Sequence, residues 1–321
     1  MCAPPWKSVK HEDGATPYNA RMRGRRGLAG FALGLLAVAV AGEAATLQMQ
    51  VRARAVQPGE VVRLIIDTGE PLDEVHVRAF GQEVPVARLS PIAWESLLGI
   101  DLDVKPGTHE VTVEASAPGR RHATSLRLEV TARRFPTRRL RVAETFVNPP
   151  PDTLARIETE AVELNAFWAL RTLQRYWDGP FTAPVPTPAN SAFGSRSVFN
   201  GEPRQPHAGA DFPSPTGAPI ASPSGGRVVL ARDLYFTGNT VVLDHGLGLV
   251  SLFAHLSAID VRVGDRVVAG QRLGQVGATG RVTGPHLHWS VRLNGARVDP
   301  LSLIAALEAT DGRQTAPSPR P

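Results

Sequence analysis

Alternating apolar and polar positions predict a series of short β-strands from residue 46 to about residue 134. Apolar residues occupy every second position in four places: Leu47, Met49 and Val51; Val75 and Val77; Val111 and Val113; Leu126, Leu128 and Val130. Turn-forming sequences separate these runs at 57–59, 68–71 and 105–107. Strands with turns at this spacing predict a small antiparallel sandwich of the immunoglobulin-like type.

The next region, 135–178, predicts a linker that contains one helix. Prolines at 149–151 interrupt regular structure, and Asp152 after them is a suitable helix N-cap. A helix that extends to about Tyr176 would have one apolar face. That face consists of residues spaced by three and four: Leu154, Ile157, Ala161, Leu164 and Trp168. We expect it to pack against one or both flanking domains.

Residues 179–304 contain short β-branched runs punctuated by glycines, which predict a mostly antiparallel β-sheet domain with a cleft. A short helix end and a polar, flexible tail follow at 305–321. The chain as a whole is therefore predicted to be mainly β. The stretch 261–274 also resembles the repeats of lipoyl and biotinyl carrier domains. Those carriers attach their cofactor to a lysine, and 179–304 contains none.

The N-terminal pattern predicts export. A basic stretch at 23–26 precedes an apolar run at 28–41 that ends in small residues, which is typical of a secretory signal peptide. The run is short for a membrane span of about 20 residues, and an uncleaved anchor within 1–45 is the alternative. A signal peptide normally begins close to the N-terminus, and residues 1–21 precede this one. We therefore expect Met22 to be the true start. The expected location is the periplasm or cell envelope, with membrane contact only through such an anchor.

Composition narrows the possible functions. A hydrophobic content of 42% over 321 residues indicates globular domains. Residues 1–45 hold six Lys or Arg against three Asp or Glu, so only +2 of the net charge of +5 belongs to the rest, and nucleic-acid binding is not expected. The only cysteine is Cys2, which excludes an intrachain disulfide and a thiolate metal site.

Histidines supply the candidate chemistry. His286 and His288 stand one residue apart at the start of an alternating strand, so they face the same side and can bind a metal or move protons. On a straight strand His207 and Asp211 would lie about 13 Å apart. They could share an ion only if Gly209 and the preceding proline let the chain bend. Two histidines and a carboxylate would supply the three protein ligands of a catalytic zinc.

The remaining histidines do not show this pattern. The chain contains no HExxH helix, so the common helical zinc motif does not apply. His255 ends an apolar run at 249–255 and is expected at the end of a buried strand. His76, His109 and His122 belong to the predicted sandwich and have no cluster around them, so we expect them to be solvent-facing strand residues.

Together these motifs resemble the lysostaphin/LytM-type zinc metallopeptidases that cut bacterial peptidoglycan. The resemblance covers roughly 179–304 and includes the sequences at 243–246 and 264–267. It implies an antiparallel β-sheet metallopeptidase domain with one zinc ion. It assigns His207, Asp211 and His288 as zinc ligands and His255 and His286 as catalytic histidines. Family members that act as inactive regulators lack some of these residues, so the resemblance implies an active enzyme.

The implied function is a secreted, monomeric, zinc-dependent endopeptidase that hydrolyses the peptide stems of peptidoglycan by metal-assisted attack of water. Without a separate wall-targeting module, the D-alanyl cross-link is expected rather than a polyglycine bridge. Which of His255 and His286 acts as the base stays open. Three alternatives also stay open: a non-catalytic activator or binder of other wall hydrolases, an adhesion or scaffold role centred on 46–133, and autoinhibition by the N-terminal domain and 183–200.

Overall fold

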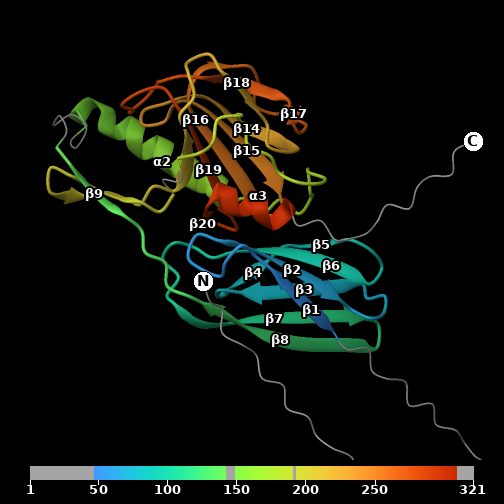
Figure 1. Cartoon of the computed structure of the whole chain (residues 1–321). Coiled ribbons are helices and arrows are strands. Elements are labelled where there is room, and N and C mark those ends of the chain that lie inside the picture. Colours follow the sequence, from blue (N-terminus) through green and yellow to red (C-terminus); the bar gives the residue numbers. More distant parts are fainter. Residues whose placement is uncertain (1–46, 142–148, 191–192, 309–321) are drawn as a thin grey trace, which may run out of the picture. The chain divides into compact units, whose positions relative to one another are not determined.

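The computed structural model describes residues 47–141, 149–190 and 193–308 (Figure 1). The predicted signal peptide or anchor lies outside the described residues, as does the tail from residue 309. None of the helices in the described ranges is both long and apolar enough to cross a bilayer. The described strands form mainly antiparallel sheets, which confirms the prediction of a mainly β protein.

The first part of the chain is a β-sandwich with immunoglobulin-like strand order. One sheet has the order β1-β2-β6-β5 and the other β4-β3-β7-β8, which corresponds to A-B-E-D and C-F-G with one added edge strand. Alternate side chains of both sheets meet in one core, as in β3, where Val75, Val77 and Ala79 point inward. The strands are β1 Gln48–Arg52, β2 Val61–Asp67, β3 Glu74–Ala79, β4 Gln82–Val84, β5 Val86–Arg88, β6 Ala93–Gly99, β7 Gly107–Ala117 and β8 Arg120–Val130.

The sandwich histidines make local contacts. The side chain of His76 is 55% exposed, as expected, and its Nδ1 lies 2.8 Å from Glu83 Oε1. His109 and His122 are instead half-buried. His109 Nε2–H donates to a backbone carbonyl, and His122 contacts a glutamate. They are packing residues of the sandwich rather than a second cluster.

The linker helix is shorter than the sequence predicts. A 3-10 turn, η1 Pro151–Thr153, leads into α2 Leu154–Trp168, so Asp152 is not the N-cap and the helix does not reach Tyr176. Beyond Trp168 the helical hydrogen bonds end, and the Thr172 carbonyl instead accepts from the Leu247 amide at 2.6 Å. Leu173, beyond the end of the helix, is 79% exposed.

The apolar face of α2 is partly buried toward its C-terminal end. Figure 1 shows where this helix lies in the fold. Leu164, Phe167 and Trp168 pack against the central strands of the large sheet in the C-terminal region, whereas Leu154 is 46% exposed. The helix therefore covers one face of that sheet with its last turns. The other side of the same sheet holds the main core of the C-terminal region.

The C-terminal region is built on a nine-stranded antiparallel sheet of order β12-β19-β16-β15-β14-β17, with β18 joining β16 to β13 and β20 pairing with β19. Its antiparallel character confirms the prediction. The chain ends its described part in α3 Pro300–Glu308. The strands are β12 Gly209–Phe212, β13 Pro219–Ala221, β14 Gly226–Leu234, β15 Gly238–Gly246, β16 Leu249–Ile259, β17 Arg266–Val267, β18 Arg272–Val276, β19 Leu287–Leu293 and β20 Ala296–Val298.

A small third sheet connects the segments that flank the linker. β9 Thr137–Leu140 follows the sandwich and runs parallel to β10 Arg196–Phe199, which pairs in turn with β11 Glu202–Pro203. The strand that leaves the sandwich is therefore hydrogen-bonded to the segment that enters β12. This sheet links two stretches that are distant in sequence.

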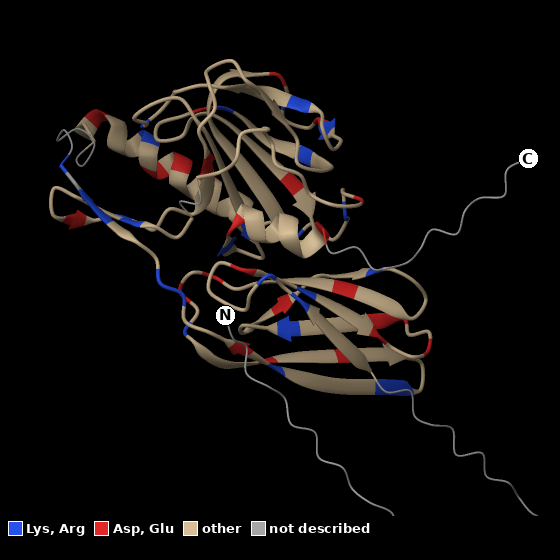
Figure 2. Ribbon diagram, in the orientation of Figure 1, with Lys and Arg blue, Asp and Glu red and all other residues tan. Residues whose placement is uncertain are grey.

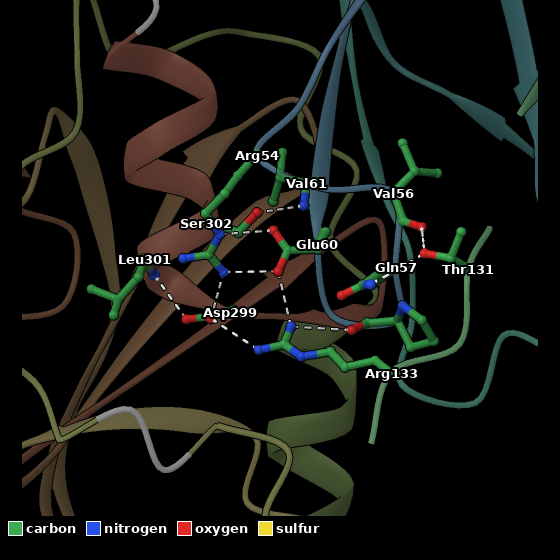
Figure 3. A network of polar contacts seen from close by, with 11 residues as sticks. Arg54, Val56, Gln57, Glu60, Val61, Thr131, Arg133, Asp299, Leu301 and Ser302 are labelled. Atoms are coloured by element: carbon green, nitrogen blue, oxygen red, sulfur yellow. Dashed lines mark hydrogen bonds and ion pairs between the residues drawn. The ribbon is translucent and has the colours of Figure 1, made fainter. Parts of the chain in front are cut away.

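The sandwich contacts the larger sheet through buried carboxylates held by arginines (Figure 3). Glu60, whose side chain is 3% exposed, accepts from Arg54 and Arg133, and Arg54 also reaches Asp299 at 2.8 Å. Nearby, Val61 belongs to the same apolar core as the larger sheet. Acidic and basic segments both appear at this contact in Figure 2. Arg54 and Arg133 thus both lie near each of these buried carboxylates, whose burial without such partners would be costly.

A candidate metal centre

His207, Asp211 and His288 converge on one point. His207 Nε2 lies 3.0 Å from Asp211 Oδ1 and 3.0 Å from His288 Nδ1, and His288 Nδ1 lies 2.8 Å from Asp211 Oδ1. Among the described residues these three form the only group of His, Cys, Asp or Glu close enough to hold a metal ion together. Their side chains keep 25%, 21% and 16% exposure, so the point is accessible to solvent.

Sheet register explains two of the three positions. β12 pairs with β19 so that Asp211 and His288 are direct cross-strand partners, whose side chains share one face. His207 lies before β12 and is brought in by a bend in the chain. Its amide donates to Ser195 at 2.9 Å, and its carbonyl accepts from Gly194 at 2.7 Å.

Gly209 serves this geometry in a different way from the one predicted. The sequence suggested that its conformational freedom allows the bend, but Gly209 has no positive φ. What it provides is space. A Cβ at this position would lie 2.6 Å from His288 Cε1 and 2.6 Å from the Trp289 carbonyl oxygen. The imidazole of His288 can therefore reach the site only past a residue without a side chain.

The donor set fits a divalent metal such as zinc. Ligands about 2.0–2.1 Å from a tetrahedral zinc stand roughly 3.3 Å apart, close to the distances found here. Ser290 Oγ lies 2.8 Å from His288 Nε2, so this nitrogen can donate a hydrogen bond to it when Nδ1 binds a metal. Burial would raise the pKa of the Asp211 carboxyl, but hydrogen bonds from His207 and His288 outweigh it. The pKa lies well below its usual value and the group is anionic.

His255 and His286 lie beside this group. His286 Nε2 is 3.8 Å from Asp211 Oδ1, and the rings of His255 and His286 are 4.9 Å apart. Each Nδ1–H donates to a backbone carbonyl at 2.9 Å, of Thr279 for His255 and of Gly284 for His286. That contact leaves each Nε2 unprotonated in the neutral ring. Burial, with repulsion from His288, lowers the pKa of His255 to about 4, so its ring is neutral at pH 7.

The position of His255 corrects the prediction that it ends a strand. β16 continues to Ile259, and the register between β15 and β16 shifts between Asn239 and Val241. This bulge holds His255 at a φ of +68°, and its amide donates to Thr237. Bulges re-aim side chains, and an L residue at positive φ stores strain that surrounding structure must offset. The bulge therefore turns His255 toward the site.

Sequence reasoning missed the residues that support these histidines. Ser290 and Thr279 were not singled out, although Ser290 stands two positions after His288 on the same face. His245 was noted only as part of a motif. It is fully buried, and its Nε2 lies 2.9 Å from Ser251 Oγ, which also accepts from Trp289 Nε1 at 3.2 Å. This chain of contacts fixes the strand that carries His288.

The described residues thus form an antiparallel β-sheet protein with one His/Asp/His group that could hold a metal and two adjoining histidines. The model of peptidase family M23 matches residues 205–300. A Pseudomonas aeruginosa crystal structure described as a peptidase M23 is 36% identical, with a TM-score of 0.62, and the match covers 79% of this chain and 97% of that one. The chain belongs to peptidase family M23, which confirms the resemblance drawn from the histidine motifs.

Named relatives are similar over the same region. The peptidoglycan DD-endopeptidase ShyA of Vibrio cholerae serotype O1 is 44% identical over 96 residues. The DD-carboxypeptidase/endopeptidase Mpg of Neisseria meningitidis serogroup B is 40% identical over 97 residues. Each match covers 30% of this chain and 22% of the relative, so the chain spans about a fifth of the length of these relatives.

Proposed function

We propose that this protein is an exported zinc-dependent endopeptidase that hydrolyses peptide cross-links of bacterial peptidoglycan. The observation that carries the proposal is the convergence of His207, Asp211 and His288 beside two histidines whose Nδ1 atoms each lie 2.9 Å from a backbone carbonyl oxygen. Membership of family M23 and the similarity to a DD-endopeptidase support the substrate class. The D-alanyl cross-link is the proposed bond, and residues 179–304 are the proposed catalytic domain.

In this proposal the chain holds one zinc ion through His207, Asp211 and His288. When bound, zinc polarises the scissile carbonyl and lowers the pKa of a water molecule toward neutrality. His255 and His286 move the protons. A neutral imidazole within reach accepts the proton of the attacking water and returns it, as imidazolium, to the leaving amine. Thr279 and Gly284 keep both rings in the tautomer that can accept this proton.

Location and architecture follow from the same proposal. Residues 1–45 would direct export to the periplasm or envelope, either as a cleaved signal or as an anchor. Residues 46–134 would form the immunoglobulin-like domain and 135–178 the linker with its helix. Peptidoglycan stems are then the partner, and the working unit is a monomer.

The test is digestion of purified peptidoglycan with the full chain, with and without a chelator, and with zinc added back. Fragments are identified by mass. We expect release of peptides cut at the D-alanyl cross-link, loss of release with chelator and recovery with zinc. His288→Ala is the matched control and should release nothing. Binding to peptidoglycan without any cut bond would reject the enzyme and favour a non-catalytic binder or activator.

A further inference from the structure

Of the three proposed ligands, His207 is the one that no strand of the large sheet holds. Asp211 and His288 are paired across β12 and β19. The backbone of His207 is held by two hydrogen bonds to Gly194 and Ser195, at 2.7 and 2.9 Å. The position of this imidazole therefore depends on the segment around residue 194.

That segment also touches Asp211, since the Asn190 amide donates to the Asp211 carbonyl at 2.9 Å. The side chain of Phe193 is 3% exposed and anchors the segment in the interior. Ser195 and Gly194 are buried with it. The described residues Asn190 and 193–195 thus lie beside two of the three proposed ligands.

The sandwich and the irregular segment that follows β8 supply the surface that holds Phe193. The Phe193 ring lies so close to Gly59 that a Cβ there would be 2.3 Å from Phe193 Cε1. The ring of Phe135 lies just as close to Gly194, where a Cβ would be 2.1 Å from Phe135 Cε1. The rings of Phe135 and Phe193 are 6.5 Å apart, and the guanidinium of Arg133 lies 5.0 Å and 6.0 Å from their centroids.

This aromatic cluster is itself fixed to the large sheet's end. Arg133 reaches Glu60 at 2.9 Å, and the carbonyl of Gly59 accepts from the Asp299 amide at 2.7 Å. The first of these contacts is part of the charged network of Figure 3. A short, continuous set of packed groups therefore joins the sandwich to the backbone of His207.

We propose that Phe135 and Phe193 are positioning residues for the metal ligand His207, so that the docked sandwich is a structural component of the metal centre. The proposal rests on the metal site proposed above. If either ring is lost, Gly194 and Ser195 lose the surface that aligns their hydrogen bonds with His207. Asp211 and His288 stay paired on the sheet, so the site keeps two ligands in place and loses the fixed third.

The test compares full-length variants by zinc affinity, measured in competition with a chelator of known affinity, and by the visible absorption spectrum of the cobalt-substituted protein. We expect Phe193→Ala and Phe135→Ala each to weaken zinc binding about tenfold or more, the range found when groups that orient a ligand are removed. The cobalt spectrum should change in both. Phe193→Leu should restore most of the affinity, because it refills the space against Gly59.

The matched control is Val113→Ala, which removes buried carbon from the sandwich core but not from the aromatic cluster. It should lower the melting temperature and leave zinc affinity and the cobalt spectrum unchanged. Wild-type affinity in both Phe variants would overturn the proposal, as would an equal loss in Val113→Ala. A wild-type chain that binds no zinc at these residues would instead reject the metal site itself. Phe135 is only half-buried, so Phe135→Ala is expected to fold. It therefore tests the proposal even if Phe193→Ala does not fold.

Discussion

Gly209→Ala is a small substitution with a large expected effect on the metal centre. The added methyl group would lie 2.6 Å from His288 Cε1, 2.7 Å from His288 Nε2 and 2.6 Å from the Trp289 carbonyl oxygen. The carbonyl cannot move without breaking the β12–β19 pairing, so the imidazole must turn away from Asp211. Such overpacking costs about 1–3 kcal/mol of folding stability. Displacement of a ligand by this contact should weaken zinc binding by about 10–100-fold.

The assay is thermal unfolding with and without zinc, alongside a chelator competition. A hundredfold weaker Kd removes about 2.7 kcal/mol of the stabilisation that saturating zinc gives the wild-type chain. Gly284→Ala is the matched control, since Gly284 adjoins the same site, has no positive φ and has open space where the methyl would point. It should keep full zinc affinity. Equal zinc-dependent stabilisation in Gly209→Ala and wild type would refute the argument that space selects this glycine.

Three further predictions follow from the same contacts. His207→Ala, Asp211→Ala and His288→Ala should lose zinc as well as hydrolysis, whereas His255→Ala and His286→Ala should keep zinc by metal analysis but turn over far more slowly; full hydrolysis by His286→Ala would remove its assigned role. Ser290→Ala deletes the acceptor of His288 Nε2–H and should weaken zinc binding about tenfold in chelator competition, with Ser257→Ala on another strand as control. Glu60→Ala leaves Arg54 and Arg133 facing Asp299 alone. It should lower the free energy of unfolding by about 2–3 kcal/mol in denaturant titrations, which is less than the loss for a fully buried pair because both arginines stay partly solvated. An unchanged transition midpoint would contradict this prediction.

Much of the fold could be predicted because its strands are half-buried. Val75 and Val77 alternate with exposed residues, and this two-residue period survives in the structure as β3. The same period correctly placed His286 and His288 on one face. The predicted length of the linker helix was wrong, because beyond Trp168 the Thr172 carbonyl accepts from the Leu247 amide of the β15–β16 turn and the helix does not continue. Periodicity reports which side chains are apolar, not where the backbone finds its hydrogen-bond partners.

The site was less predictable where it depends on backbone detail. Nothing in the sequence around His255 marks a bulge, because an L residue at positive φ is selected by the surrounding strands rather than by its own preference. Gly209 was predicted to matter for the wrong reason. A glycine in a sequence does not show whether its flexible backbone or its missing side chain is what the structure requires. The Arg54–Asp299 pair joins residues 245 positions apart, so no local sequence pattern could predict it.

The docked sandwich gives opposite expectations under two hypotheses. If the N-terminal domain inhibits by covering the site, loosening it should raise turnover. If it positions His207 through Phe193, loosening it should weaken zinc binding and lower turnover. Deleting the sandwich cannot separate these effects cleanly, because Val61 and Leu97 belong to the apolar core of the large sheet and their loss would expose it. Point substitutions in the aromatic cluster leave that core intact. Turnover measured at saturating zinc then separates the two hypotheses. If the sandwich positions His207, saturating zinc should bring the turnover of the variants back toward that of the wild type. If the sandwich covers the site, turnover should rise above that of the wild type even at saturating zinc.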